Sequence, residues 1–368
     1  MGKLNDLGSL GQAVWLDFVD RKFLEAGGLK KLVEEDGLTG VTSNPSIFEK
    51  AMGHGEAYDG SLAEFDRANP GAATIDRYEA LAVQDIKAAA DTLRPVYDRL
   101  DGKDGYVSLE VSPYISDDTD ATIAEAQKLW GMVNRPNLMI KIPGTPAGTP
   151  AIAATIANGI NVNVTLLFSQ EAYQRVALAY CDGLEKRAAD GHPIDRIASV
   201  ASFFVSRIDT AIDKKIDELG TDEAKALRGK VAIANAKMAY QWYLECLKSD
   251  RWQALAAKGA MPQRLLWAST GTKDKAYPDT LYVDTLIGRD TVNTMPPTTM
   301  DAFRERGTAA ETLTEDIDEA KHVLAEAERL GLDLNGVTEL LVSEGVASFV
   351  KAFDDLTGSI AAKQPAAA

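Results

Sequence analysis

The chain has 368 residues, and 45% of them are hydrophobic, an ordinary fraction for a globular protein. Its 55 acidic residues outnumber its 39 basic ones, so the formal net charge is −16. A surface this acidic argues against a general nucleic-acid binder and against a membrane-surface protein, and an anionic substrate would need a local patch of cations.

Eight short apolar runs recur along the chain, most of them separated by amphipathic helical stretches. This alternation predicts an α/β fold in which a parallel sheet closes into a single (β/α)₈ TIM barrel. The last run is the least distinct, because residues 281–287 have the better strand composition. A parallel crossover after the seventh strand needs a helix, however, and this segment can supply it. The expected strands are residues 13–19, 38–44, 105–111, 137–143, 160–168, 197–205, 264–270 and 290–295.

Two connections are too long for a bare barrel, and both have helical patterns. Residues 45–104 are expected to hold two or three helices, and residues 206–263 a second set. Neither segment has a linker-like composition at its edges, so both are interpreted as helical insertions on one barrel domain that spans residues 1–360. Residues 298–360 form a helical C-terminal segment, and the tail 361–368 is expected to be disordered.

Cysteines and histidines are few and carry no metal-binding spacing. Cys181 and Cys246 lie in helix-like segments, which indicates reduced thiols in the cytosol. His54, His192 and His322 fall in loops or exposed helical stretches, so a histidine-based triad or metal site is not expected. No apolar run is long enough to span a bilayer. We therefore expect a cytoplasmic protein with no membrane and no nucleic-acid partner.

The most informative stretch is NLMIKIPG, residues 137–144, in which one lysine interrupts a buried strand. Lys141 could extend to the strand end and pair with a carboxylate, as most strand lysines do. Alternatively it could form a Schiff base, because only the unprotonated amine attacks a carbonyl and an apolar setting disfavours the ammonium. The spacing alone does not decide between these two interpretations.

Alternation along the strands predicts a polar interior. Side chains of a strand point alternately to its two faces, and helices must cover the apolar face. Polar layers of this kind can simply satisfy one another around trapped water, but three buried charges are costly without a use. The residues expected to point inward, most of them near the carboxyl ends of the strands, are Asp17, Thr42, Asn44, Ser108, Glu110, Lys141, Asn161, Asn163, Thr165, Ser202 and Ser269.

With these residues in hand, the chain resembles the transaldolases over nearly its whole length. Seven motifs carry the resemblance, in order on seven expected strands: WLDF around Asp17, GVTSNPSIF from Gly40, SLEVSP around Glu110, LMIKIPGTPAG around Lys141, GINVNVTLLFS from Gly159, VASFFVSRID from Val200 and WASTGTKD from Trp267. Any one of them would be a weak signal, whereas the ordered set is highly specific.

The resemblance implies a class I aldolase-type barrel of the pentose phosphate pathway that works without a cofactor. It would move a dihydroxyacetone unit from sedoheptulose 7-phosphate to glyceraldehyde 3-phosphate, giving erythrose 4-phosphate and fructose 6-phosphate. The partners are then small sugar phosphates, while a monomer and a homodimer both stay open.

The resemblance also implies roles for single residues. Lys141 matches the Schiff-base lysine, Asp17 the acid/base for the donor's C4 hydroxyl, and Glu110 with Thr165 the pair that holds a catalytic water. Positions that match the donor-binding and phosphate-binding residues are Thr42, Asn44, Asn163, Ser202, Phe204, Arg207 and Ser269.

The chain departs from the family pattern after Ser269. Many members have an arginine two residues later, whereas this chain reads STGTK and offers Lys273 as a substitute phosphate ligand. The NTMPPTT stretch from Asn293 suggests a longer, bacterial-type branch. Three other functions stay open: an aldolase that releases free dihydroxyacetone, a non-catalytic sugar-phosphate binder, and a metal-dependent barrel enzyme.

Overall fold

The computed structural model describes residues 2–53 and 56–363, and it contains a closed barrel of parallel strands in the order β1 to β8. The predicted (β/α)₈ TIM barrel is therefore confirmed. Each strand falls within or beside its predicted run, and residues 281–287 supply a short helix rather than a strand. The strands are β1 Gln12–Leu16, β2 Gly40–Val41, β3 Tyr106–Glu110, β4 Leu138–Pro143, β5 Val162–Leu167, β6 Ser199–Phe204, β7 Arg264–Ala268 and β8 Thr291–Met295.

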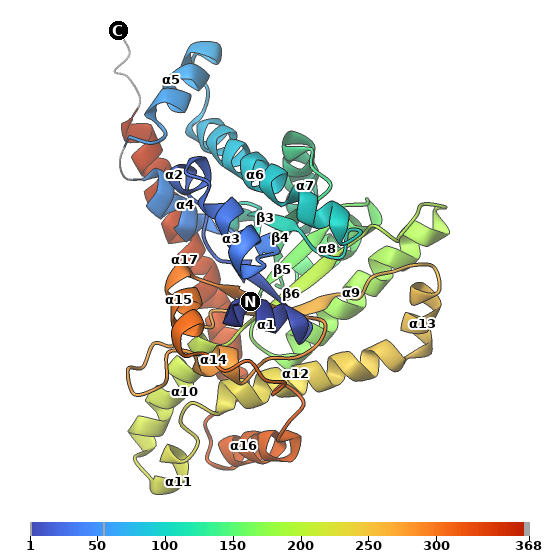
Figure 1. Cartoon of the computed structure of the whole chain (residues 1–368), viewed down its shortest axis with the longest axis vertical. Coiled ribbons are helices and arrows are strands. Elements are labelled where there is room, and N and C mark those ends of the chain that lie inside the picture. Colours follow the sequence, from blue (N-terminus) through green and yellow to red (C-terminus); the bar gives the residue numbers. More distant parts are fainter. Residues whose placement is uncertain (1, 54–55, 364–368) are drawn as a thin grey trace.

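Helices surround the barrel on its outer side (Figure 1). The two long connections are helical in the described residues, as expected, and so is most of the segment after β8. The helices are α1 Lys3–Ser9, α2 Arg21–Glu25, α3 Gly28–Asp36, α4 Pro45–Met52, α5 Asp59–Ala68, α6 Thr74–Arg99, α7 Thr119–Val133, α8 Gly148–Ala157, α9 Gln170–Ala189, α10 Ser206–Leu219, α11 Asp222–Lys225, α12 Val231–Lys248, α13 Asp250–Ala256, α14 Leu281–Asp284, α15 Pro297–Arg306, α16 Ile317–Arg329 and α17 Leu334–Ala362, with a 3₁₀ turn η1 at Pro113–Ile115.

The register of the sheet fixes which side chains meet inside the barrel. Glu110 on β3 pairs with Lys141 on β4, and Lys141 pairs in turn with Asn163 on β5. Side chains at paired positions of neighbouring strands share one face. The aliphatic residues on either side of Lys141, Ile140 and Ile142, are fully buried. The register thus brings a carboxylate, an amine and an amide side by side.

Strand β5 does not keep the strict alternation that its sequence predicts through Phe168. Its register to β6 shifts between Val164 and Leu167, and Leu166 has a positive φ of 58°. A bulge of this kind re-aims side chains near the end of a strand. Leu166 contacts α17, since a Cβ built on Gly345 would lie 2.8 Å from its Cδ2 atom. The glycine therefore allows α17 to pack closely against the end of β5.

Helix α17 runs along one side of the molecule and packs against α4, α10 and α6 (Figure 1). It continues to Ala362, two residues into the tail that was expected to be disordered, and residues 364–368 lie outside the described part of the chain. Its inward face carries Gly345, Phe349 and Phe353, which are spaced four residues apart and therefore lie on one side of the helix.

Asn161 does not belong to the polar layer at the carboxyl ends of the strands, where it was expected. It precedes β5, and its amide donates to the carbonyl oxygens of Pro136 and Leu138, both at 3.0 Å. Its Oδ1 atom accepts from the Ala198 N–H at 2.9 Å. Asn161 thus holds together the amino ends of neighbouring strands.

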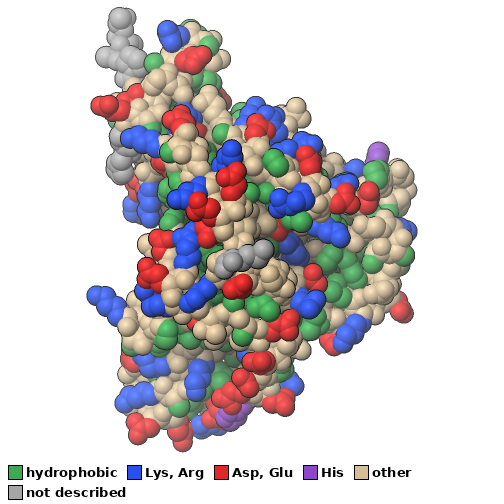
Figure 2. Space-filling model, in the orientation of Figure 1, with side chains coloured by type: hydrophobic (Ala, Val, Ile, Leu, Met, Phe, Trp, Pro, Cys, Tyr) green, Lys and Arg blue, Asp and Glu red, His purple; other side chains and the backbone are tan. Residues whose placement is uncertain are grey.

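The surface carries charges of both signs. Figure 2 shows acidic and basic side chains interspersed over one face of the molecule. Cys181, which is buried, and Cys246, which is half-buried, are both free thiols on helices, as the sequence indicates. His54 lies outside the described residues. In the described part of the chain, no helix is long and apolar enough to cross a membrane.

Candidate active site

A cavity of about 320 Å³ lies at the carboxyl ends of the strands. It gathers nine of the twelve site residues predicted from the sequence, which come from segments far apart in the chain. Because catalytic residues of TIM barrels sit at this end of the strands, the location fits an active site. The nine residues are Asp17, Thr42, Asn44, Lys141, Ser202, Phe204, Arg207, Ser269 and Lys273.

Lys141 is the centre of this arrangement, and its side chain is only 5% exposed. Its Nζ atom lies 3.3 Å from Glu110 Oε2 and donates a hydrogen bond to the Ser43 carbonyl oxygen at 3.1 Å. The ring of Phe349 on α17 lies on another side, with its centroid 5.8 Å from Nζ. The amine therefore faces the cavity and is held away from bulk solvent by groups from β3, from the connection between β2 and α4, and from α17.

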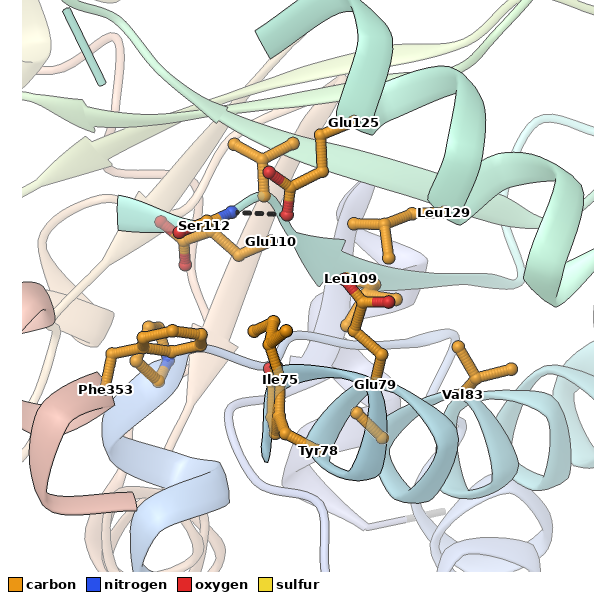
Figure 3. Close-up of a pocket in the computed structure, with 13 residues that line it drawn as sticks. Ile75, Tyr78, Glu79, Val83, Leu109, Glu110, Ser112, Glu125, Leu129 and Phe353 are labelled. Carbon is orange, nitrogen blue, oxygen red and sulfur yellow. Dashed lines mark hydrogen bonds between the residues drawn. The ribbon is translucent and has the colours of Figure 1, made fainter. Parts of the chain in front are cut away.

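Glu110 lines no part of this cavity but borders a separate small pocket. Figure 3 shows that pocket, where Glu110 lies near Tyr78 and Phe353. Burial raises the pKa of Glu110 to about 7, although the neighbouring Lys141 amine works in the opposite direction. A carboxyl that titrates near neutral pH can both take and give a proton under physiological conditions. Glu110 is therefore suited to proton transfer beside the lysine.

Asp17 follows β1 directly and faces the cavity. The Thr42 hydroxyl donates to its Oδ1 atom at 2.6 Å, and a second hydroxyl, that of Thr294, lies 2.7 Å from Thr42 Oγ1. Burial raises the pKa of Asp17, while Lys141, Thr42, Arg207 and Lys50 each act to lower it. A carboxylate with a raised pKa is a better base than an ordinary aspartate.

Thr165 and Asn163, both on β5, do not line this cavity. Thr165 is fully buried, and its hydroxyl has no hydrogen-bond partner among the described residues. Asn163 donates to Ser108 Oγ at 3.0 Å and accepts from the Ser202 hydroxyl at 2.7 Å. Asn163 therefore fixes the position of Ser202, which does line the cavity, and the free hydroxyl of Thr165 can still bind a small polar molecule.

Asn44 occupies the first position before helix α4. Its Oδ1 atom accepts from the Ile47 N–H at 3.0 Å, which satisfies one of the free amide groups at the start of the helix. Within the described part of the chain, the side-chain amide nitrogen donates no hydrogen bond; Asn44 lines the cavity, so this nitrogen can donate to a ligand. Asn44 thus caps the start of α4 with its side-chain oxygen and keeps its side-chain nitrogen available as a hydrogen-bond donor.

Besides Lys141, three cationic side chains line the cavity: Arg207, Lys273 and Lys50. Burial lowers the pKa of Arg207, but an arginine remains cationic throughout the physiological range. Its guanidinium lies 5.2 Å from the centre of the Phe204 ring and, within the described residues, pairs with no carboxylate. Three cations in a protein of net charge −16 form the local patch that an anionic substrate requires.

Ser269 sits beside Arg207 in a strained backbone conformation. Its φ is 56°, in the left-handed region that few residues other than glycine adopt, and its hydroxyl lies 2.8 Å from that of Ser206. Strained backbone of this kind is concentrated at functional sites. The turn directs Ser269 and the following loop, which carries Lys273, to the cavity.

Sequence reasoning missed eight residues of the cavity lining, among them one cation, Lys50, and one aromatic ring, Phe349. Lys50 lies on α4, which begins at the carboxyl end of a barrel strand, so its position near the mouth could have been inferred from the Asn44 motif. Phe349 had no such signal, because its place above Lys141 depends on how α17 crosses the end of the barrel.

Comparison with known proteins supports the resemblance seen in the sequence. Residues 14–360 match the family described as Transaldolase/Fructose-6-phosphate aldolase. A transaldolase from Thermobifida fusca is 50% identical over 359 residues, which is 97% of each chain. A transaldolase from Trichodesmium erythraeum is 48% identical and covers 98% of this chain and 97% of its own length. A protein named Transaldolase 2 from Streptomyces coelicolor is 50% identical, covering 98% of this chain and 96% of its own. With a match that spans nearly every residue, this chain belongs to the transaldolase/fructose-6-phosphate aldolase family.

Proposed function

We propose that this protein is a transaldolase of the pentose phosphate pathway. It transfers a dihydroxyacetone unit from sedoheptulose 7-phosphate to glyceraldehyde 3-phosphate and yields erythrose 4-phosphate and fructose 6-phosphate. The observation that carries the proposal is the buried Lys141 amine, which faces the cavity 3.3 Å from the Glu110 carboxyl. The full-length similarity to named transaldolases adds to it.

The first step is the formation of a Schiff base between Lys141 and the keto carbon of the donor. The amine attacks the carbonyl carbon, and the carbinolamine then loses its hydroxyl as water. Glu110 lies close enough to Lys141 to exchange protons with these groups, directly or through a water that the Thr165 hydroxyl holds.

The second step is cleavage of the C3–C4 bond. The iminium draws the bonding electrons toward nitrogen, provided that a base takes the proton of the C4 hydroxyl. Asp17 is that base, because it lines the cavity and its raised pKa favours proton uptake. The aldehyde product leaves, and the three-carbon unit stays bound to Lys141 as an enamine.

The third step reverses this chemistry with the acceptor aldehyde. The enamine carbon attacks the aldehyde carbon, Asp17 returns its proton to the new hydroxyl, and water releases the ketose from Lys141. Arg207, Lys273 and Lys50 hold the phosphate of donor and acceptor, with Arg207 offering two parallel N–H donors.

Borohydride reduction in the presence of fructose 6-phosphate tests the covalent step. The reduced three-carbon or six-carbon adduct should appear by mass spectrometry on the peptide that contains Lys141, and Lys141→Ala should have neither adduct nor turnover. Lys237 is a matched internal control, since it is also buried but donates to the Glu315 carbonyl oxygen at 2.8 Å, away from the cavity. An adduct on Lys237 alone, or none on Lys141, would contradict the proposal.

The family name also includes fructose-6-phosphate aldolase, which is the second candidate. Incubation with fructose 6-phosphate and no acceptor distinguishes the two activities. Rapid release of free dihydroxyacetone identifies the aldolase, whereas an unreduced covalent intermediate that passes its three-carbon unit on only after an acceptor is added identifies the transferase.

A further inference from the structure

The inward face of α17 forms a roof over the two central residues of the site. Gly345 lets the helix approach Leu166 at the end of β5. One turn later, Phe349 lies over Lys141 Nζ, and one further turn on, Phe353 borders the small pocket beside Glu110 (Figure 3). The roof is thus continuous from the amine to its carboxyl partner.

Phe349 is the part of this roof that faces the reacting group. It is 3% exposed, it lines the cavity, and its ring centre lies 5.8 Å from Lys141 Nζ. At this distance an aromatic ring attracts a cation, by about 0.5–2 kcal/mol depending on how well water is excluded. The ring also occupies the space from which water would otherwise reach the nitrogen and its attached carbon.

Neighbouring rings hold this face of α17 in place. Phe353 meets Tyr78 of α6 edge to face at 5.2 Å and Tyr114 of η1 at 5.6 Å. Leu356 and Ile360, further along the helix, are fully buried. The roof is therefore anchored to several elements and does not depend on Phe349 for its position.

We propose that Phe349 determines whether the three-carbon intermediate is transferred or hydrolysed, an inference that rests on the proposed Schiff base at Lys141. Hydrolysis consumes one water overall. The enamine carbon takes a proton, water adds to the resulting iminium carbon, and the C–N bond to Lys141 breaks to give dihydroxyacetone and the free amine. Phe349 slows this route because its ring covers the Lys141 nitrogen and the substrate carbon attached to it. Water is thereby excluded until the acceptor aldehyde binds.

The test compares two activities of the same variant. Dihydroxyacetone release from fructose 6-phosphate without acceptor is divided by the rate of transfer to erythrose 4-phosphate. Phe349→Ala should raise this ratio by about tenfold or more, which corresponds to a barrier to hydrolysis lower by about 1.4 kcal/mol once the ring no longer excludes water. Phe349→Leu keeps most of the apolar volume and should give a smaller rise, and it guards against a failure of the alanine variant to fold.

Leu356→Ala is the matched control, because it removes a buried side chain from the same helix but lies outside the cavity lining. It should lower the melting temperature without changing the ratio. A ratio within twofold of the wild type in both Phe349 variants, or the same rise in Leu356→Ala, would overturn the inference. Borohydride trapping separates the two proposals: an adduct on Lys141 with an unchanged ratio refutes only the role of Phe349, and a missing adduct refutes the Schiff base itself.

Discussion

Glu110→Gln is expected to stabilise the fold and to impair catalysis at the same time. Glutamine has nearly the shape of a protonated glutamate but never carries a charge. The side chain is 5% exposed, so the charged form loses most of its hydration in the folded protein. The substitution therefore removes the desolvation cost that destabilises the wild-type fold whenever Glu110 is ionised.

The size of this effect follows from the pKa of Glu110. Burial raises it from an ordinary 4.5 to about 7, and each pKa unit corresponds to about 1.36 kcal/mol. The favourable contribution of the protonated carboxyl is complete below pH 4.5 and is lost as the pH rises to about 7. Glu110→Gln should thus match the wild type near pH 4.5 and have a free energy of unfolding about 3 kcal/mol higher at pH 8.

The attraction to Lys141 does not reverse this expectation. Two charges 3.3 Å apart attract by roughly 5 kcal/mol at an effective dielectric constant of about 20. That attraction already lowers the pKa of Glu110, and burial still outweighs it. Buried ion pairs often fail to recover their desolvation cost.

Urea unfolding at pH 5 and pH 8 measures the effect, and the rate of adduct formation at Lys141 measures the loss of proton transfer. Glu79→Gln is a suitable control, because Glu79 is also buried but forms an ion pair with Lys128 at 2.6 Å outside the site. The control should gain no stability at pH 8. If Glu110→Gln unfolded more readily than the wild type at pH 8, the ionised pair would have to stabilise the fold, and the reasoning from burial would be refuted.

Three further substitutions test the remaining groups. Asp17→Asn should still give the borohydride adduct from fructose 6-phosphate, but single-turnover cleavage should slow by about 10²-fold or more, because no base takes the C4 proton; wild-type cleavage would remove Asp17 from this role. Thr165→Val deletes a buried hydroxyl that has no partner among the described residues, so it should raise the free energy of unfolding by about 1 kcal/mol. It should also slow adduct formation at Lys141. An unchanged rate of adduct formation would show that Thr165 does not hold the water used in these steps. Arg207→Ala should raise KM for phosphorylated substrates about 10- to 100-fold and barely change KM for unphosphorylated ones. Lys50→Ala should give a smaller effect of the same kind. An equal rise in KM for both substrate types would argue against phosphate binding by these residues.

The barrel itself could be predicted from the sequence because its signals are local. Apolar runs such as residues 137–143 and 197–205 are bounded by turn residues, and their alternation shows which side chains face inward. Lys141, Glu110 and Ser202 followed from this rule alone. The alternation failed at Leu166, where a bulge and a positive φ interrupt the strand. The alternation of polar and apolar residues in β5 does not predict that bulge.

Contacts made across the fold were beyond the reach of sequence patterns. Phe349 looks like any core residue of an amphipathic helix, and only the path of α17 over the barrel brings it to Lys141. Asn161 shows the opposite error, since its inward position was correctly expected but its height in the barrel was not. It lies before β5 starts, where it bonds to backbone groups of the neighbouring connections. Periodicity reports the face of a strand and not the depth along it.

The position of Asn161 nevertheless bears on the site. A slip of one residue in the pairing of β4 would turn Lys141 from the interior to the helical layer, because successive side chains point to opposite faces. Asn137 prevents such a slip at the start of β4, with its amide donating to the Ala90 and Gly105 carbonyl oxygens, both at 2.9 Å. Asn161 likewise prevents a slip at the start of β5, because its amide donates to the Leu138 carbonyl oxygen of β4. The buried amides of Asn137 and Asn161 at one end of the barrel therefore set the register that brings Glu110 and Lys141 together at the other, and both residues act as positioning groups.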